Sequence, residues 1–254
     1  MNKLRAVLKM IRNINSKDVM RRFESVSLFS KLVLPEYRMT WPQMKWWQNK
    51  FFNAYLEKFS EKDSFNTHRK WMLSQLIRLT EDVDGETAEC GVYEGASSWL
   101  ICESNHKQSK FKKTHHIFDS FEGLGSPEFS DGSYWKKGDL ACSEESTLNN
   151  LLEFGERIVS HPGWIPDRFN EVENLKFSFV HVDVDLYEPT RDSIVFFYER
   201  LNPGAVFLCD DYGFTSCPGA TMAVDEFLQN KPEKMIALDA GGGFFIKGVV
   251  TSHN

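Results

Sequence analysis

The chain has 254 residues, of which 41% are hydrophobic, and this is enough apolar material to fill the core of one large domain with a helical appendage. Its formal net charge of -6 excludes a general electrostatic attraction to nucleic acid. The five cysteines are scattered, without the paired spacing of a zinc site or a disulfide framework, so we expect reduced thiols in a cytoplasmic protein.

The first residues predict a basic amphipathic helix. Leu4, Val7, Leu8, Ile11 and Ile14 recur at helical spacing, and basic residues occupy the other faces. Such a helix can lie on an anionic membrane surface, but packing on its own domain or on a partner subunit is more common, and we expect that here. No stretch is typical of a signal peptide or of a membrane-spanning helix.

Residues 39–79 are rich in tryptophan and phenylalanine and mostly helical in period, as in "WPQMKWWQNKFF". Two interpretations stay open: helices that cover a core, and a lid over a ligand pocket. We assign residues 1–80 to an N-terminal helical region that acts as a lid or in oligomerisation, and residues 81–254 to a second domain. The aromatic content of the first region favours a homo-oligomer.

After residue 80 the chain changes to short apolar runs separated by helical patterns. The runs are "TAECGV", "HHIFDSF", "RIVSH", "FSFVHVDVD", "GAVFLCDD", "MIALDA" and "GFFIKGVV". Strands that alternate with helices indicate an α/β fold with a doubly wound, mostly parallel, seven-stranded sheet. Only "AGGG" joins the last two runs, which is too short for a helical crossover, so they predict a terminal antiparallel hairpin.

Residues 123–146, "GLGSPEFSDGSYWKKGDLACSEES", form the best candidate for a mobile loop. Their glycines, serines and mixed charges do not predict a regular element. A loop of this length is typical of a functional segment, but a disordered insertion is an equally good interpretation.

The first predicted strand runs into "ECGVYEGASS". Gly91 and Gly95 allow the backbone to turn closely around a ligand, although a purely structural turn would explain two glycines equally well. They do not form the complete fingerprint of dinucleotide-binding proteins. The second strand ends at Asp119, 28 residues beyond Gly91, where an acidic side chain can accept hydrogen bonds from both ribose hydroxyls. The glycine turn and Asp119 together favour a cofactor that contains adenosine.

Carboxylates end the fourth and fifth strands. Asp183 and Asp185 end the fourth, and Asp210 and Asp211 end the fifth, so parallel neighbours would bring them to one edge of the sheet. Crowded carboxylates repel one another or hold a cation, and oxygen donors favour magnesium, manganese or calcium. We predict Asp183, Asp210 and Asp211 as ligands, whereas Asp185 can instead cap the next helix.

His181 precedes Asp183 on the same face of the fourth strand. A satisfied core histidine and a functional histidine are equally good interpretations. We predict Asp183 as catalytic, with His181 as a second candidate.

These motifs resemble the macrocin O-methyltransferase family. The resemblance covers roughly residues 87–248 and rests on "ECGVYEGASS", "FDSFEGL", "HVDVDLYEPT" and "CDDYG" followed by "CPGA" and "AVDEF". It implies a class I methyltransferase sheet, with S-adenosylmethionine as methyl donor and Mg²⁺ or Mn²⁺ on Asp183, Asp210 and Asp211. The expected cofactor-binding residues are Glu89, Gly91, Val92, Tyr93, Gly95, Ser98, Asp119, Ser120 and Trp164.

The sequence thus predicts a metal-assisted O-methyltransferase that acts on a hydroxyl of a sugar, as a small glycosylated natural product or a glycan. A bound cation would lower the pKa of a coordinated hydroxyl, which is otherwise a poor nucleophile. Two alternatives stay open: a nucleotide-dependent oxidoreductase, and a catalytically degenerate domain that serves as an assembly module.

Overall fold

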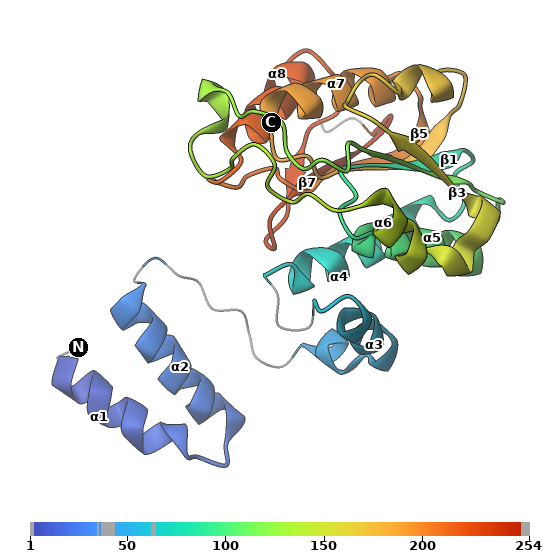
Figure 1. Ribbon diagram of the computed structural model, residues 1–254. Coiled ribbons are helices and arrows are strands. Elements are labelled where there is room, and N and C mark those ends of the chain that lie inside the picture. Colours follow the sequence, from blue (N-terminus) through green and yellow to red (C-terminus); the bar gives the residue numbers. More distant parts are fainter. Residues whose placement is uncertain (1–2, 35, 37–43, 62–64, 250–254) are drawn as a thin grey trace. The chain divides into compact units, whose positions relative to one another are not determined.

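The computed structural model describes residues 3–34, 36, 44–61 and 65–249, with side chains described from residue 7 onward. Leu4 and residues 39–43 of the aromatic segment therefore lie outside the described side chains. Contacts divide the chain into two compact units, Met1–Lys58 and Phe59–Asn254, and each is described by itself (Figure 1). The role of residues 1–80 as a lid or oligomerisation region stays a prediction.

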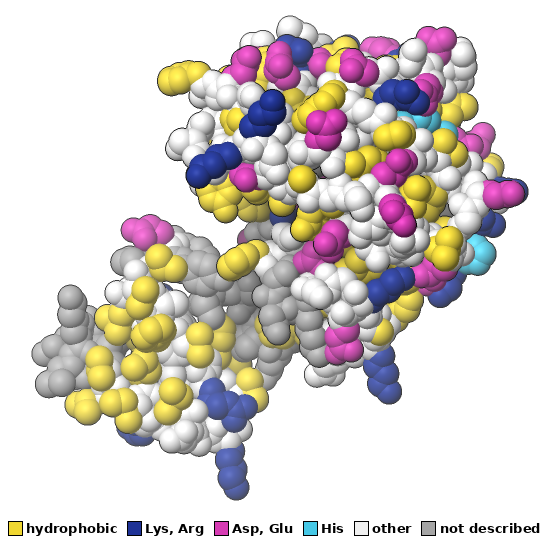
Figure 2. All heavy atoms as spheres, viewed as in Figure 1, with side chains coloured by type: hydrophobic (Ala, Val, Ile, Leu, Met, Phe, Trp, Pro, Cys, Tyr) yellow, Lys and Arg dark blue, Asp and Glu magenta, His cyan; other side chains and the backbone are white. Residues whose placement is uncertain are grey.

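The first unit is helical. It contains α1 (Lys3–Ile14), α2 (Val19–Val33), η1 (Lys45–Gln48) and α3 (Lys50–Lys58). The predicted amphipathic helix is α1, which forms a hairpin with α2, and Asp18 caps α2 by accepting a hydrogen bond from the Met20 amide at 2.9 Å. Figure 2 displays hydrophobic side chains gathered over the lobe of these two helices. Among the described helices, none combines the length and the apolar character needed to cross a bilayer.

The second unit is built on a seven-stranded sheet in the order β3-β2-β1-β4-β5-β7-β6. β1 to β5 are parallel, whereas β7 runs antiparallel to both β5 and β6. The predicted fold is confirmed, including the terminal hairpin. The strands are β1 (Glu86–Cys90), β2 (His115–Asp119), β3 (Ile158–Pro162), β4 (Phe177–Val182), β5 (Leu201–Cys209), β6 (Ile236–Ala237) and β7 (Gly243–Ile246).

Helices cover both faces of this sheet (Figure 1). α7 and α8 lie on one side, and α4, α5 and α6 on the other. The helices are α4 (Thr67–Leu76), α5 (Ala96–Lys107), α6 (Glu144–Asn150), α7 (Tyr187–Tyr198) and α8 (Pro218–Leu228), with the short helices η2 (Ile77–Thr80), η3 (Phe129–Asp131), η4 (Leu152–Arg157) and η5 (Phe169–Val172). This arrangement leaves the carboxyl ends of the parallel strands as the edge where ligands bind in such sheets.

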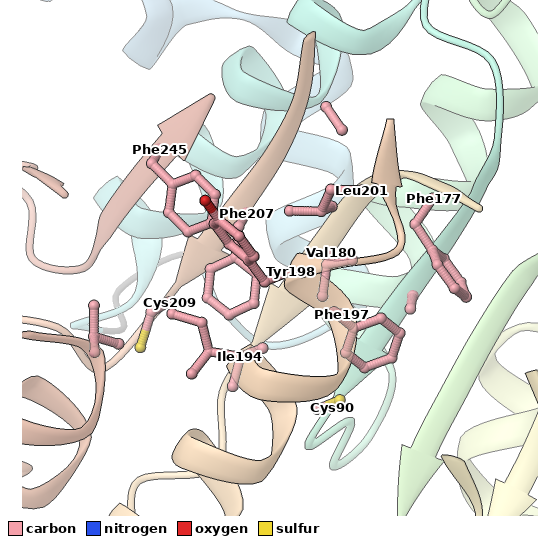
Figure 3. Close-up of a cluster of buried hydrophobic side chains, with 14 of the residues drawn as sticks. Cys90, Phe177, Val180, Ile194, Phe197, Tyr198, Leu201, Phe207, Cys209 and Phe245 are labelled. Carbon is pink, nitrogen blue, oxygen red and sulfur yellow. The ribbon is translucent and has the colours of Figure 1, made fainter. Parts of the chain in front are cut away.

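The core lies between the sheet and α7. Every residue of β4 is buried, as its continuous apolar run predicts for a central parallel strand. Aromatic rings fill the space beside it (Figure 3): Phe177 meets Phe197 edge to face at 5.0 Å, and Phe207 stacks on Phe245 at 5.2 Å. The strand that ends at Asp183 is therefore held firmly on both faces.

We expect Phe197→Ala to destabilise the fold strongly. Phe197 is fully buried, so its removal loses transfer free energy and leaves a cavity, at a cost of about 3–5 kcal/mol. The measurement is the free energy of unfolding in urea. Val195→Ala on the same helix is the control, because Val195 is 50% exposed and should cost much less. Equal losses from the two variants would contradict this account of the core.

The segment predicted as a loop has few regular elements but many internal contacts. The Leu124 amide donates to the Asp139 carbonyl at 2.8 Å, and the Gly138 amide donates to the Leu124 carbonyl at 2.9 Å. Asp131 in η3 accepts a hydrogen bond from the Glu128 amide at 2.8 Å. These contacts fold the segment onto itself.

Candidate functional site

A cavity of about 730 Å³ opens at the carboxyl ends of the parallel strands. Its wall contains many of the residues predicted from the sequence, namely Gly91, Val92, Tyr93, Asp119, Ser120, Trp164, Asp183 and Asp211. The other predicted residues, Glu89, Gly95, Ser98, His181 and Asp210, are not part of its lining. The loop of residues 123–146 also contributes, through residues such as Leu124, Tyr134 and Trp135.

The glycine turn after β1 has a structural cause. Gly91 has a φ of +78°, and a Cβ atom there would lie 1.8 Å from the carbonyl oxygen of Asp183. The Asp183 amide in turn donates to the Cys90 carbonyl at 2.8 Å. Only glycine can adopt this backbone with a neighbouring strand so close. Gly95 also has a positive φ, +83°, and forms the N-cap of α5.

Asp119 connects the ends of β1 and β2. One of its carboxylate oxygens accepts hydrogen bonds from the amides of Val92, at 2.7 Å, and Tyr93, at 3.2 Å. The other accepts from the Phe121 amide at 2.7 Å. A carboxylate offers about four lone-pair positions, so acceptor capacity remains on the side of Asp119 that lines the cavity.

Ser120 and Trp164 also belong to the cavity wall. The Ser120 hydroxyl donates to the Gly123 carbonyl at 3.0 Å and accepts from the Glu122 amide at 3.1 Å, which fixes the start of the loop. The Trp164 side chain is 40% exposed, so its ring offers a flat apolar surface.

A buried polar network lies outside the cavity lining. Glu89 accepts hydrogen bonds from Ser98 and from His181, the latter at 2.7 Å. His115 contacts Ser98 at 3.1 Å. Burial alone would raise the pKa of Glu89, but His115, at 3.7 Å, and the hydrogen bond from His181 lower it to about 2. Glu89 is therefore an ionised carboxylate that holds histidine side chains in place.

His181 connects this network to the carboxylates at the strand ends. Its Nδ1 faces Glu89, and its Nε2 lies 3.6 Å from a carboxylate oxygen of Asp210. That distance exceeds a normal hydrogen bond, and Nε2 is buried without a hydrogen-bond partner, so the attraction is chiefly between charges. Burial alone would lower the pKa of His181, but Asp210 and Glu89 raise it to about 9.

The aspartates at the strand ends form two sets of ligand atoms. Donor atoms of His181, Asp183 and Asp210 lie within 4.8 Å of one another, and those of Asp185, Asp211 and Cys217 form the second set. Asp211 accepts hydrogen bonds from the amides of Val184 and Asp185, at 3.1 and 2.8 Å. Asp183 and Asp210 therefore meet as predicted, and Asp211 turns toward Asp185.

The carboxylates differ in their proton affinity. Burial raises the pKa of Asp183, with Asp210 adding to the effect, and burial followed by the charge of Asp183 raises the pKa of Asp185 to about 7. Burial and Asp185 likewise raise the pKa of Asp211. Burial also acts on Asp210, but nearby cations keep its pKa well below the ordinary value.

Two cations from α4 meet these carboxylates, and sequence reasoning did not find them. Arg69 forms an ion pair with Asp210 and donates to its backbone carbonyl at 3.3 Å, and its guanidinium lies 5.1 Å from the ring centre of Phe214. The buried Lys70 donates to Ser97 and lowers the pKa values of Asp183 and Asp210. The only local sign of these two residues in the sequence was that Arg69 and Lys70 are adjacent basic residues in an aromatic helical segment.

The alternative role proposed for Asp185, as the cap of the next helix, is wrong. The N-cap position of α7 is Leu186, and no side chain makes a capping bond from there. Instead, Asp131 from η3 accepts a hydrogen bond from the Tyr187 amide at 2.7 Å. Asp185 has a φ of +61°, and its carboxylate meets Cys217 Sγ at 3.5 Å. The loop of residues 123–146 therefore supplies the cap.

The donor set fits a hard divalent cation. Four aspartates offer oxygen, the donor that Mg²⁺ prefers. Among the described residues, Arg69, Lys70 and His181 are the cationic groups that act on Asp183 and Asp210, and three positive charges leave four ionised carboxylates under-compensated. Burial first, and then the repulsion among the carboxylates, raises the pKa values of Asp183, Asp185 and Asp211, and a divalent cation would offset that repulsion.

Comparison with known proteins places the chain in a family. Residues 69–247 match the family described as macrocin-O-methyltransferase (TylF). The chain is 26% identical over 230 residues to demethyldecarbamoylnovobiocin O-methyltransferase of Streptomyces niveus, with 76% of this chain and 86% of the relative covered. It is 28% identical over 154 residues to 8-demethyl-8-(2,3-dimethoxy-alpha-L-rhamnosyl)-tetracenomycin-C 4'-O-methyltransferase of Streptomyces olivaceus, with 56% and 58% covered.

Solved structures agree with this match. The O-methyltransferase NovP superposes with a TM-score of 0.58 at 25% identity, over 69% of this chain and 79% of that one. The calicheamicin methyltransferase CalS11 superposes with a TM-score of 0.65 over 97% and 91% of the two chains, and at 16% identity it supports the fold alone. The chain therefore belongs to the macrocin O-methyltransferase family and is an O-methyltransferase.

Proposed function

We propose that the protein transfers a methyl group from S-adenosylmethionine to a sugar hydroxyl of a glycosylated natural product or a glycan, with the assistance of Mg²⁺ or Mn²⁺. One observation carries the proposal: the glycine turn after β1 and the aspartates after β4 and β5 meet in the wall of one cavity. The relatives support the acceptor class, because their names describe a demethyldecarbamoylnovobiocin and a rhamnosyl tetracenomycin as methyl acceptors.

The reaction asks two things of the protein. Methyl transfer from sulfur to oxygen is an in-line displacement, so donor and acceptor have to be aligned. The turn at Gly91 and the segment of Asp183 after β4 supply this alignment, because their backbones are in contact. The acceptor oxygen also has to be nucleophilic. Asp183 and Asp210, whose carboxylates meet, together with Asp211 beside Asp185, would hold a divalent cation, which would supply that chemistry by lowering the pKa of the hydroxyl.

The roles of the two predicted catalytic residues can be separated. His181 is fully buried and is not part of the cavity lining, so it acts by holding Asp210 and does not touch the acceptor. Asp183, Asp185 and Asp211 do line the cavity. The acceptor's proton therefore passes to one of these aspartates or to water. A homo-oligomer in the cytoplasm stays part of the prediction.

The test uses cofactor binding and turnover on the purified chain. We expect calorimetry to detect binding of S-adenosylhomocysteine but not of NAD, and mass spectrometry to detect methylated products from a panel of glycosides with S-adenosylmethionine and Mg²⁺. EDTA should abolish turnover, and added Mn²⁺ or Mg²⁺ should restore it. Full turnover in EDTA would remove the metal from the mechanism.

The same measurements separate the alternatives. An oxidoreductase would bind NAD, but it requires a sheet made of two mononucleotide-binding halves, whereas in this sheet the antiparallel strand β7 follows β5. A degenerate assembly module would bind a partner stoichiometrically and show neither cofactor binding nor a metal requirement. Family membership and the intact set of cavity residues favour the enzyme.

A further inference from the structure

The seam between α1 and α2 is polar. The Ser25 hydroxyl donates to the Met10 carbonyl at 3.1 Å, and Glu24 pairs with both Lys9, at 3.0 Å, and Asn13, at 3.3 Å. Among the described side chains of residues 7–34, only Asn13 and Ser25 are buried. Polar contacts therefore join the two helices, and none of their described apolar side chains is fully buried, whereas buried apolar residues fill the seam of an ordinary helical hairpin.

Val7, Met10, Phe23 and Leu28 of the hairpin are half-buried, but its other large apolar residues are mostly exposed. On α1, Leu8, Ile11 and Ile14 are spaced for one helix face and are between 55 and 59% exposed. On α2, Val26 and Phe29 are 51 and 56% exposed. Val19, Leu32, Val33 and the C-cap residue Leu34 are also exposed. Hydrophobic side chains gather over the lobe of α1 and α2 in Figure 2. Contiguous apolar surface of this kind marks an interaction site.

The charge of the hairpin decides between partners. Residues 1–34 contain eight lysines and arginines but only two acidic residues, whereas the whole chain has a net charge of -6. The same hairpin of a second copy would bring two strongly basic surfaces together, which like-charge repulsion disfavours. An anionic lipid surface offers an acyl layer to the apolar residues and negatively charged headgroups to the basic residues.

We propose that the hairpin of α1 and α2 lies in the plane of an anionic phospholipid bilayer and holds the enzyme at that surface. With 12 and 15 residues, the helices are shorter than the roughly 20 residues needed to span a bilayer, but they suit the interface. Ile11 and Phe29 enter the acyl boundary, and Arg12 and Arg22, both exposed, stay among the headgroups. This proposal does not depend on the acceptor or the metal.

The test is co-sedimentation of the full chain with vesicles. We expect it to sediment with phosphatidylcholine vesicles that contain phosphatidylglycerol, to remain in solution with phosphatidylcholine alone, and to detach at high salt. The double variant Ile11→Glu, Phe29→Glu should bind at least about tenfold more weakly. Arg12→Gln and Arg22→Gln should each weaken binding to the anionic vesicles about fivefold, because a basic residue near such a surface contributes that much.

Leu152→Glu is the matched control, because Leu152 is 75% exposed on η4 in the second unit and its replacement should leave vesicle binding unchanged. Circular dichroism and calorimetry with S-adenosylhomocysteine establish that each variant is folded. The proposal is overturned if the full chain ignores anionic vesicles. It is also overturned if the double variant Ile11→Glu, Phe29→Glu still binds vesicles but an oligomer of the protein dissociates, as measured by analytical ultracentrifugation. The apolar surface of the hairpin would then contact a second copy of the chain.

Discussion

Replacing Asp183 by asparagine is expected to abolish metal binding and yet make the metal-free protein more stable. The carboxylate is one of four crowded at the strand ends, and burial together with Asp210 raises its pKa, so its ionised form costs folding free energy. Because the folded pKa is raised, the cost exists above the unfolded pKa of about 3.9 and vanishes below it. The asparagine side chain carries no charge and avoids this cost near neutral pH.

Three measurements on Asp183→Asn check this expectation. Mn²⁺ affinity, followed by electron paramagnetic resonance, should fall more than about a hundredfold, since even the loss of a residue that only orients a ligand costs 10- to 100-fold. The melting temperature in EDTA should rise at pH 7 and match the wild type near pH 3. Binding of S-adenosylhomocysteine should persist.

The control for Asp183→Asn is Asp167→Asn, because Asp167 is exposed and should change none of these quantities. Unchanged Mn²⁺ affinity in Asp183→Asn would remove Asp183 from the metal site. A lower melting temperature would mean that Asp183 has a stabilising partner that outweighs the repulsion.

Asp210→Asn should have the opposite effect on stability, although it lies in the same cluster. Arg69, His181 and Lys70 keep its pKa well below the ordinary value, so ionised Asp210 stabilises the fold above the unfolded pKa of about 3.9 and loses this effect as the pH falls. Arg69 and Asp210 are 18 and 5% exposed, and breaking such a buried pair by removing one partner costs about 3–5 kcal/mol.

A double-mutant cycle measures the contact. Arg69→Met and Asp210→Asn should each lower the free energy of unfolding by about 3–5 kcal/mol, and the double variant should lose much less than the sum, because neither partner is then left unpaired. Arg78→Met is the control, since the exposed pair of Arg78 with Glu81 contributes at most about 1 kcal/mol. Additive losses in the cycle would refute the coupling between Arg69 and Asp210.

The sequence predicted the sheet well because its strands carry strong local patterns. The apolar run from Phe177 to Val182 is buried on both faces, and the short "AGGG" connection permits only an antiparallel return. The meeting of Asp183 with Asp210 followed from the rule that parallel strands end at one edge. These features depend on residues that are close in sequence or on general properties of parallel sheets.

Other parts of the site were beyond sequence reasoning. Arg69 reaches Asp210 across 141 positions of the chain, and no local pattern predicts a contact between them. Asp211 follows Asp210 directly, but both lie in the turn after β5, where strand alternation no longer predicts side-chain direction, and Asp211 meets Asp185 instead. The prediction that Asp185 caps α7 was wrong for a similar reason. Asp131, from a loop distant in sequence, accepts the hydrogen bond from the first turn of that helix.

The contact of Gly91 with the Asp183 carbonyl separates the part of the cavity wall whose geometry is fixed by the sheet from the part whose side chains can change. No side chain fits between the turn after β1 and the end of β4, so neither can shift without the other. The distance between the glycine turn and the first of the aspartates is thus built into the sheet. Side chains elsewhere in the wall, such as Leu124 and Tyr134, take no part in that contact, so they can vary in sequence and change which acceptor fits without disturbing it.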